Sequence, residues 1–265
     1  MGISREEIER QKRERLGEET YNYYGTLMKI VEYNSSADIT IEFQDEYKTR
    51  IKNREYKEFL KGGIKNPYDK EVCDVGCIGV GKYKSRGKNG EKTKAYLYWT
   101  DMLDRCYNPY SLNKRNDYID VFVCEEWLCF QNFAKWFYEN YYECNGEKMQ
   151  LDKDILVKGN KIYSPQTCIF TPSRINMMFI KQKKHRGKCP IGVKYHKRDN
   201  KFEVNCSNKN KEYQYLGRFD NEMEAFACYK NFKEKVIKQV ADEYKDLIPK
   251  ELYEALYKYE VEIND

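Results

Sequence analysis

The most constraining feature of this chain is a change of hydrophobic period near its carboxy-terminal end. Residues 191–196, 201–206 and 213–219 alternate apolar and polar side chains with a period of two, separated by turn-forming residues. After Asp220-Asn221, a capping pair, the period becomes helical. The apolar residues there are Met223, Ala225, Phe226, Ala227, Tyr229 and Phe232. The pattern predicts a three-stranded sheet packed on a helix, within an α+β chain.

The alternation also assigns side chains to the two faces of this sheet. The side chains expected under the helix are Val193, Phe202, Val204, Cys206 and Leu216. Those expected on the opposite face are Lys194, His196, Lys201, Glu203, Asn205, Ser207, Tyr213 and Tyr215. Lysine can neutralise phosphate, asparagine can read adenine, and tyrosine can pack on sugar or a thymine methyl. The alternative is that the tyrosines and the histidine only cover an open sheet.

Positive charge is concentrated in the same part of the chain. Residues 181–240 contain 16 Lys and Arg against 7 Asp and Glu, although the net charge of the whole chain is only +5. Regional basicity of this kind is the usual footprint of a polyanion-binding surface. The charge distribution therefore favours a nucleic-acid partner.

The order Gly192-Val193, a Phe-containing strand, Leu216-Gly217-Arg218-Phe219-Asp220 and a Glu-Ala helix resembles the APETALA-type domain of plant ethylene-response factors. Related domains occur in phage homing endonucleases, and the resemblance covers roughly residues 189–241. In that family the sheet lies in the major groove of double-stranded DNA. The resemblance implies DNA contacts by Lys194, His196, Arg198, Lys201, Asn205, Ser207, Tyr213, Tyr215 and Arg218. Because Lys194 and His196 stand where the plant proteins carry arginines, no sequence preference is carried over.

A second motif is the acidic hairpin that begins Leu151-Asp152-Lys153-Asp154 and leads to Asn176. It resembles the hairpin and helix of HNH nucleases, which hold one divalent metal ion. The resemblance implies Asp152, Asp154 and Asn176 as catalytic residues, and Asp152 and Asn176 as oxygen ligands of Mg²⁺, the only cofactor it implies. No histidine precedes Lys184, so the general base of that family is absent. Either a carboxylate replaces this base, or the module is degenerate and structural.

The rest of the chain predicts two further parts. Residues 5–15 predict a solvated helix, and residues 27–32 and 39–43 predict strands joined by a turn, in a small β module that ends near Pro67. The middle predicts a helix over 98–107, capped by Thr100 or Asp101, and a helix over 125–141 with an aromatic core face. We therefore expect domains at 1–70, 71–185 and 186–265.

Two other patterns indicate no ligand. Gly79-x-Gly81 lies in a glycine- and lysine-rich stretch, but no Gly-Lys-Ser/Thr follows it, so it does not predict a phosphate loop. The spacing of Cys73 and Cys77 fits a zinc ribbon poorly. Most of the ten cysteines are expected to be reduced and to pack as small apolar side chains.

The charged amino terminus and the lack of a long apolar run predict neither an export signal nor a membrane span. The order of all these segments resembles bacteriophage proteins labelled HNH-like or homing-endonuclease-like. This resemblance implies a DNA-binding protein in the cytoplasm of a bacterial host. The alternative is a phage-encoded inhibitor that binds a host defence protein or its nucleotide signal. Such an inhibitor would show an aromatic, charge-depleted patch, whereas a DNA-binding protein needs a basic stripe.

Overall fold

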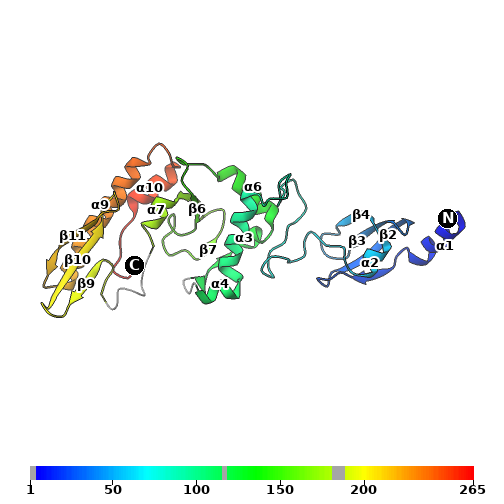
Figure 1. The fold of residues 1–265 in the computed structure, drawn as a ribbon, viewed down its shortest axis with the longest axis horizontal. Coiled ribbons are helices and arrows are strands. Elements are labelled where there is room, and N and C mark those ends of the chain that lie inside the picture. Colours follow the sequence, from blue (N-terminus) through cyan, green and yellow to red (C-terminus); the bar gives the residue numbers. More distant parts are fainter. Residues whose placement is uncertain (1–3, 115–117, 181–188) are drawn as a thin grey trace. The chain divides into compact units, whose positions relative to one another are not determined.

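The computed structural model describes residues 4–114, 118–180 and 189–265. The chain forms two compact units, Met1–Glu139 and Asn140–Asp265, and Figure 1 labels most of their elements. The predicted α+β class is confirmed, with a four-stranded sheet in the first unit and a three-stranded sheet in the second. Residues 181–188, which include His185 and the expected domain boundary at 185/186, lie outside the described residues. The division into three domains stays a prediction.

The first unit begins with a capped helix and a meander of antiparallel strands. The side chain of Ser4 accepts a hydrogen bond from the backbone N–H of Glu7 (3.2 Å) at the start of the helix. The elements are α1 (Arg5–Arg15), β1 (Glu19–Tyr21), β2 (Leu27–Ser35), β3 (Asp38–Phe43), β4 (Arg50–Arg54) and α2 (Tyr56–Leu60). One face of the sheet packs on Phe59 of α2, so the predicted β module has its own apolar core.

Helices lie among long loops in the remainder of the first unit. They are α3 (Lys94–Tyr107), α4 (Pro109–Lys114), α5 (Glu125–Leu128) and α6 (Phe130–Asn140), with the short strand β5 (Phe122–Val123) between α4 and α5. The expected cap at Thr100 or Asp101 is wrong. The side chain of Thr93 caps α3, while the hydroxyl of Thr100 donates to the carbonyl of Leu97 inside the helix. Among helices of the described part, none is long and apolar enough to cross a membrane.

The single helix expected over residues 125–141 is interrupted at Cys129. This residue is extended (φ −91°, ψ 122°) and forms a bridge with Cys77. The N–H of Cys77 donates to the carbonyl of Leu128 (3.0 Å), and the N–H of Phe130 donates to the carbonyl of Cys77 (2.9 Å). These long-range hydrogen bonds replace helical ones, so the helix divides into α5 and α6. The aromatic face is nevertheless core, as predicted, with Trp127 and Phe133 fully buried.

The second unit combines a strand pair, a short helix and the three-stranded sheet. The first group contains β6 (Met149–Asp152), β7 (Ile162–Tyr163), β8 (Ile169–Pro172) and α7 (Ser173–Met177), with β6 and β8 antiparallel. The second contains β9 (Val193–His196), β10 (Lys201–Ser207), β11 (Tyr213–Phe219), α9 (Glu222–Glu243) and α10 (Lys250–Lys258). The sheet order is β11-β10-β9, and α9 runs along one face of it (Figure 1).

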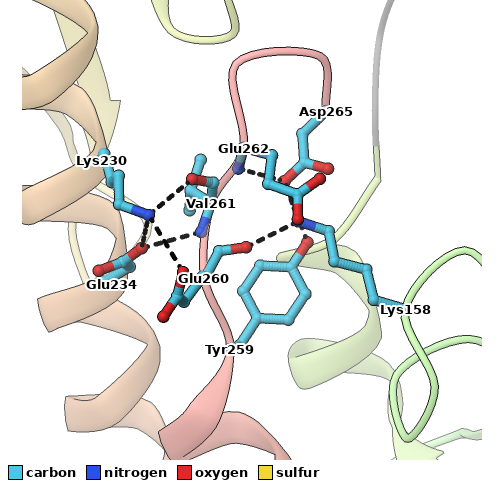
Figure 2. Close-up of polar contacts among 8 residues, drawn as sticks. All are labelled: Lys158, Lys230, Glu234, Tyr259, Glu260, Val261, Glu262 and Asp265. Atoms are coloured by element: carbon cyan, nitrogen blue, oxygen red, sulfur yellow. Dashed lines mark hydrogen bonds and ion pairs between the residues drawn. The ribbon is translucent and has the colours of Figure 1, made fainter.

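The chain that follows α10 joins these two groups (Figure 2). Nζ of Lys158, which lies in the loop between β6 and β7, donates to the carbonyl of Glu260 (2.7 Å) and to Oδ2 of Asp265 (2.9 Å). On the other side, Lys230 of α9 donates to the carbonyl of Val261 (3.0 Å), whose side chain is buried under the sheet. The segment 260–265 therefore connects the loop after β6 to the helix that supports the sheet.

Gly192 allows the sheet to approach α9 closely. Its φ is +75°, and a Cβ atom there would lie 2.0 Å from Cδ2 of Tyr229. A real side chain therefore requires both a strained backbone and a displaced ring. The glycine of the Gly192-Val193 motif is thus explained by packing.

We expect Gly192→Ala to lower the free energy of unfolding by about 2–5 kcal/mol, combining left-handed strain with overpacking. Gly159→Ala is the matched control, because Gly159 has φ +78° but no atom lies within 4 Å of the place that its Cβ would occupy. It should cost only the backbone strain, about 1–2 kcal/mol. Urea denaturation of both variants measures the difference. Equal losses would show that the contact with Tyr229 is unimportant.

Candidate nucleic-acid interface

The face of the three-stranded sheet turned away from α9, here called the outer face, carries most of the predicted DNA-binding residues. Cross-strand partners connect them: His196 with Lys201, Lys194 with Glu203, Tyr215 with Asn205, Tyr213 with Ser207, and Arg218 with Glu203. The inner face carries Val193, Val204 and Cys206, all buried, together with partly buried Phe202 and Leu216. The division of side chains between the faces is therefore confirmed.

Tyrosines dominate the open end of the outer face. Tyr213 and Tyr215 are 74% and 60% exposed. Lys194 and Ser207 are also exposed, and Arg198 lies in the exposed turn between β9 and β10. These side chains are exposed to solvent in the second unit, so they are available to a partner.

A β-bulge brings Arg218 to the outer face. Val204 pairs with Gly217, but Asn205 pairs with Tyr215, so Leu216 has no partner on β10. Gly217 has φ +135°, a conformation that glycine adopts easily. Strict alternation would place residues 215 and 218 on opposite faces, because they are three positions apart. The extra residue puts both on the same face.

Glu203 lies at the centre of the outer face, next to several of its polar side chains. Its Oε2 lies 3.0 Å from Nη2 of Arg218 and 3.3 Å from Nε2 of His196. Asn205 also donates to its Oε1 (3.0 Å). Hydrogen bonds from Asn205 and Arg218 hold the pKa of Glu203 below its usual value, so it is ionised at neutral pH. The outer face is therefore a mixed-charge surface.

Among the described residues, some cations of the interface are paired with a carboxylate, and others are not. Arg218 also pairs with Asp199 (2.7 Å), and Lys201 pairs with Asp220. In the described parts of the chain, no carboxylate forms an ion pair with Lys194 or Arg198. Alternation predicted that Glu203 lies on this face, but it did not predict the ion pairs of Glu203. It did not identify Asp199 at all. The register of the strands would have shown the role of Glu203, because it places this acidic residue opposite both Lys194 and Arg218.

Asp152 and Asp154, the predicted catalytic carboxylates, lie at the end of β6. Oδ1 of Asp152 accepts hydrogen bonds from the backbone N–H groups of Asp154 (2.9 Å) and Ile155 (2.7 Å). These bonds close a turn directly after the strand. Nζ of Lys153 lies 3.2 Å from Oδ2 of Asp154. The contacts therefore give Asp152 a structural role in reversing the chain.

Asn176, the third predicted residue, lies on α7, which packs on β6 and β8. Magnesium requires a near-octahedral set of oxygen ligands. Oδ1 of Asp152 already accepts two hydrogen bonds, and Asp154 is paired with Lys153. No group of three or more His, Cys, Asp or Glu within the described ranges could hold a metal ion. The three residues fit a magnesium site poorly, and their catalytic role stays a prediction from the sequence.

Burial and, less strongly, the negative charge of Asp154 raise the pKa of Asp152 to about 6. The folded protein therefore binds this proton more tightly than the unfolded chain does. The stabilisation is present below about pH 4 and is lost as the pH rises through 6. At higher pH the protein contains an ionised carboxylate in an unfavourable place.

We expect Asp152→Asn to remove this penalty while its amide oxygen keeps the two backbone hydrogen bonds. At pH 7.5 the variant should be more stable than the wild type by about 1–3 kcal/mol, whereas near pH 4 the two should be similar. Urea denaturation at both pH values tests this. A variant less stable than the wild type at pH 7.5 would contradict it, and a magnesium-dependent stabilisation seen only in the wild type would restore Asp152 as a ligand.

No protein-family model, no curated protein and no solved structure matches this chain.

Proposed function

We propose that the protein binds double-stranded DNA through the outer face of its three-stranded sheet. The observation that carries the proposal is the one-sided sheet itself. One face is buried under α9, and the other presents Lys194, Tyr213, Tyr215 and Arg218 from its strands. The resemblance of residues 189–241 to APETALA-type domains supports the same use of the sheet. We place this activity in the cytoplasm of a bacterial host, as expected for a phage-type protein.

The chemistry of the outer face suits the major groove of DNA, which admits β-strands as well as helices. Lys194 and Arg198 supply positive charge that no carboxylate of the described residues neutralises. Asn205 can donate to and accept from adenine, and the exposed tyrosine rings can pack on sugars or thymine methyl groups. Arg218 is oriented by its hydrogen bonds to Glu203 before any partner arrives. The face therefore offers both phosphate contacts and contacts to base edges.

We expect binding to duplex DNA to weaken steeply between about 50 and 200 mM salt, because phosphate contacts release counterions. The combined change Lys194→Ala, His196→Ala and Tyr215→Ala should reduce affinity by about tenfold or more, since each base contact contributes about 1–3 kcal/mol. Fluorescence anisotropy with a labelled duplex measures both effects, and a thermal scan confirms that the variant is folded.

The matched control replaces Lys250 and Lys258 of α10 by alanine, because both side chains are largely exposed (88% and 80%). It removes positive charge of the second unit away from the outer face. Equal affinity losses in the two variants would show nonspecific attraction. Undetectable binding to duplex DNA at low salt would contradict the proposed function.

Glu203 offers a separate test, because it places a negative charge in the middle of the proposed interface. We expect Glu203→Gln to bind duplex DNA about three- to tenfold more tightly at low salt, since it frees Arg218 and removes repulsion from phosphate. The salt dependence should also become steeper. Weaker binding by this variant would mean that the carboxylate itself contacts DNA, as it would when accepting from cytosine N4.

A second function stands as the alternative, namely an inhibitor that binds a host defence protein or its nucleotide signal. Its support is the exposure of Tyr213 and Tyr215, because exposed tyrosines are enriched in protein interfaces. The salt series separates the two. Binding to a protein through these rings would not require duplex DNA and would respond weakly to salt.

A further inference from the structure

The first unit contains a cavity of about 540 Å³ whose walls are basic and aromatic. Its lining includes four cations from one short segment, Lys82, Lys84, Arg86 and Lys88, and the rings of Tyr83 and Tyr138. This volume lies within the range of sites that hold a small ligand. The segment belongs to the glycine- and lysine-rich stretch from which the sequence predicted no phosphate loop.

The backbone of this segment is held in place by its neighbours. The side-chain amide of Gln131 accepts from the N–H of Tyr83 (3.0 Å) and donates to its carbonyl (2.8 Å). A Cβ on Gly81 would lie 2.2 Å from Oε1 of Gln131, so this glycine makes room for the amide. The hydroxyl of Thr93, the cap of α3, donates to the carbonyl of Lys84 (3.0 Å). The backbone of the site is therefore held in place before a ligand binds.

The lysines of the cavity differ from the cations of the outer face. Across the residues that the structure describes, no carboxylate forms an ion pair with Lys82, Lys84 or Lys88. The nearby acid, Glu91, accepts instead from the backbone N–H of Asn89 (3.1 Å). Arg86 donates through Nη1 to the carbonyl of Gly90 (2.7 Å), which restrains its guanidinium. Like charges gathered in this way attract an anion with several negative groups.

The tyrosines add a recognition element that a simple anion would not use. The rings of Tyr83 and Tyr138 stack with centroids 5.4 Å apart and planes 17° from parallel. Tyr138 is 55% exposed, so part of its ring stays open to a further planar group. Stacking of a base on such a ring adds affinity and tolerates any base.

We propose that this cavity binds single-stranded nucleic acid, with phosphates on the cations and a base against Tyr138. A single phosphate does not need four cations, whereas a strand brings one charge per nucleotide. The site is independent of the duplex-binding face, because every lining residue belongs to the first unit.

The test uses the full chain and a fluorescent twelve-nucleotide oligothymidine in about 50 mM salt. Replacing Lys82, Lys84 and Lys88 by alanine should weaken binding by about tenfold or more. The control replaces Lys52, Lys57 and Lys61, three exposed lysines of the same unit that do not line the cavity. It should change affinity by less than about twofold. Equal losses in the two variants would overturn the proposal.

Tyr138 provides the second arm of the test. Tyr138→Phe keeps the ring and should bind like the wild type, whereas Tyr138→Leu should lose about fivefold or more. Thermal scans confirm that both fold. Equal affinities of the two variants would overturn the stacking role. Displacement of the oligonucleotide by adenosine monophosphate at equal concentration would overturn the assignment to a strand and favour a free nucleotide.

The outer-face variant with Lys194, His196 and Tyr215 replaced should still bind the oligonucleotide as the wild type does. Loss of single-strand binding in this variant would place the site on the sheet and overturn the proposal. Retention, even if duplex binding proves absent, supports a separate site in the first unit.

Discussion

Helix α9 covers one face of the three-stranded sheet, and the properties of the second unit follow from that one-sided cover. The strands alternate their side chains, so burying Val204 and Cys206 under the helix turns Glu203 and Asn205 outward. Tyr229 can pack so closely because Gly192 has no side chain. A face left open in this way must be polar, and it can therefore serve recognition without cost to the core.

The two proposed binding regions use positive charge in different ways. On the outer face, Arg218 and Lys201 each lie beside a carboxylate. Exposed ion pairs of this kind contribute little to stability, so their main effect is to orient the side chains. In the cavity of the first unit the lysines lack such partners among the described residues, and the backbone is fixed by Gln131 instead. Ion pairs thus orient the side chains of the outer face, whereas in the cavity hydrogen bonds to Gln131 hold the backbone that carries the lysines.

Local patterns predicted much of the fold, and long-range contacts account for the differences. Alternation was sufficient to assign Val193 and Tyr215 to opposite faces, because burial under one helix imposes a period of two. It could not show that Cys129 leaves the helix to pair with Cys77, which is far away in the sequence. The candidate site was also predicted only in part. Its side chains were assigned to the correct face of the sheet, but the role of Glu203 and the turn closed by Asp152 depend on register and on backbone donors.

The bulge in β11 has a consequence for how such a face can change during evolution. Because Leu216 is an unpaired extra residue, the positions before it and after it on this strand are out of phase. Loss of the Leu216 codon would restore strict pairing and would leave Tyr213, Tyr215 and Arg218 on the outer face, because residues 215 and 218 would then be two positions apart. Strands β9 and β10 would keep their sequence and their packing. The bulge is therefore a place where the strand can lose one residue while the recognition surface keeps the same side chains.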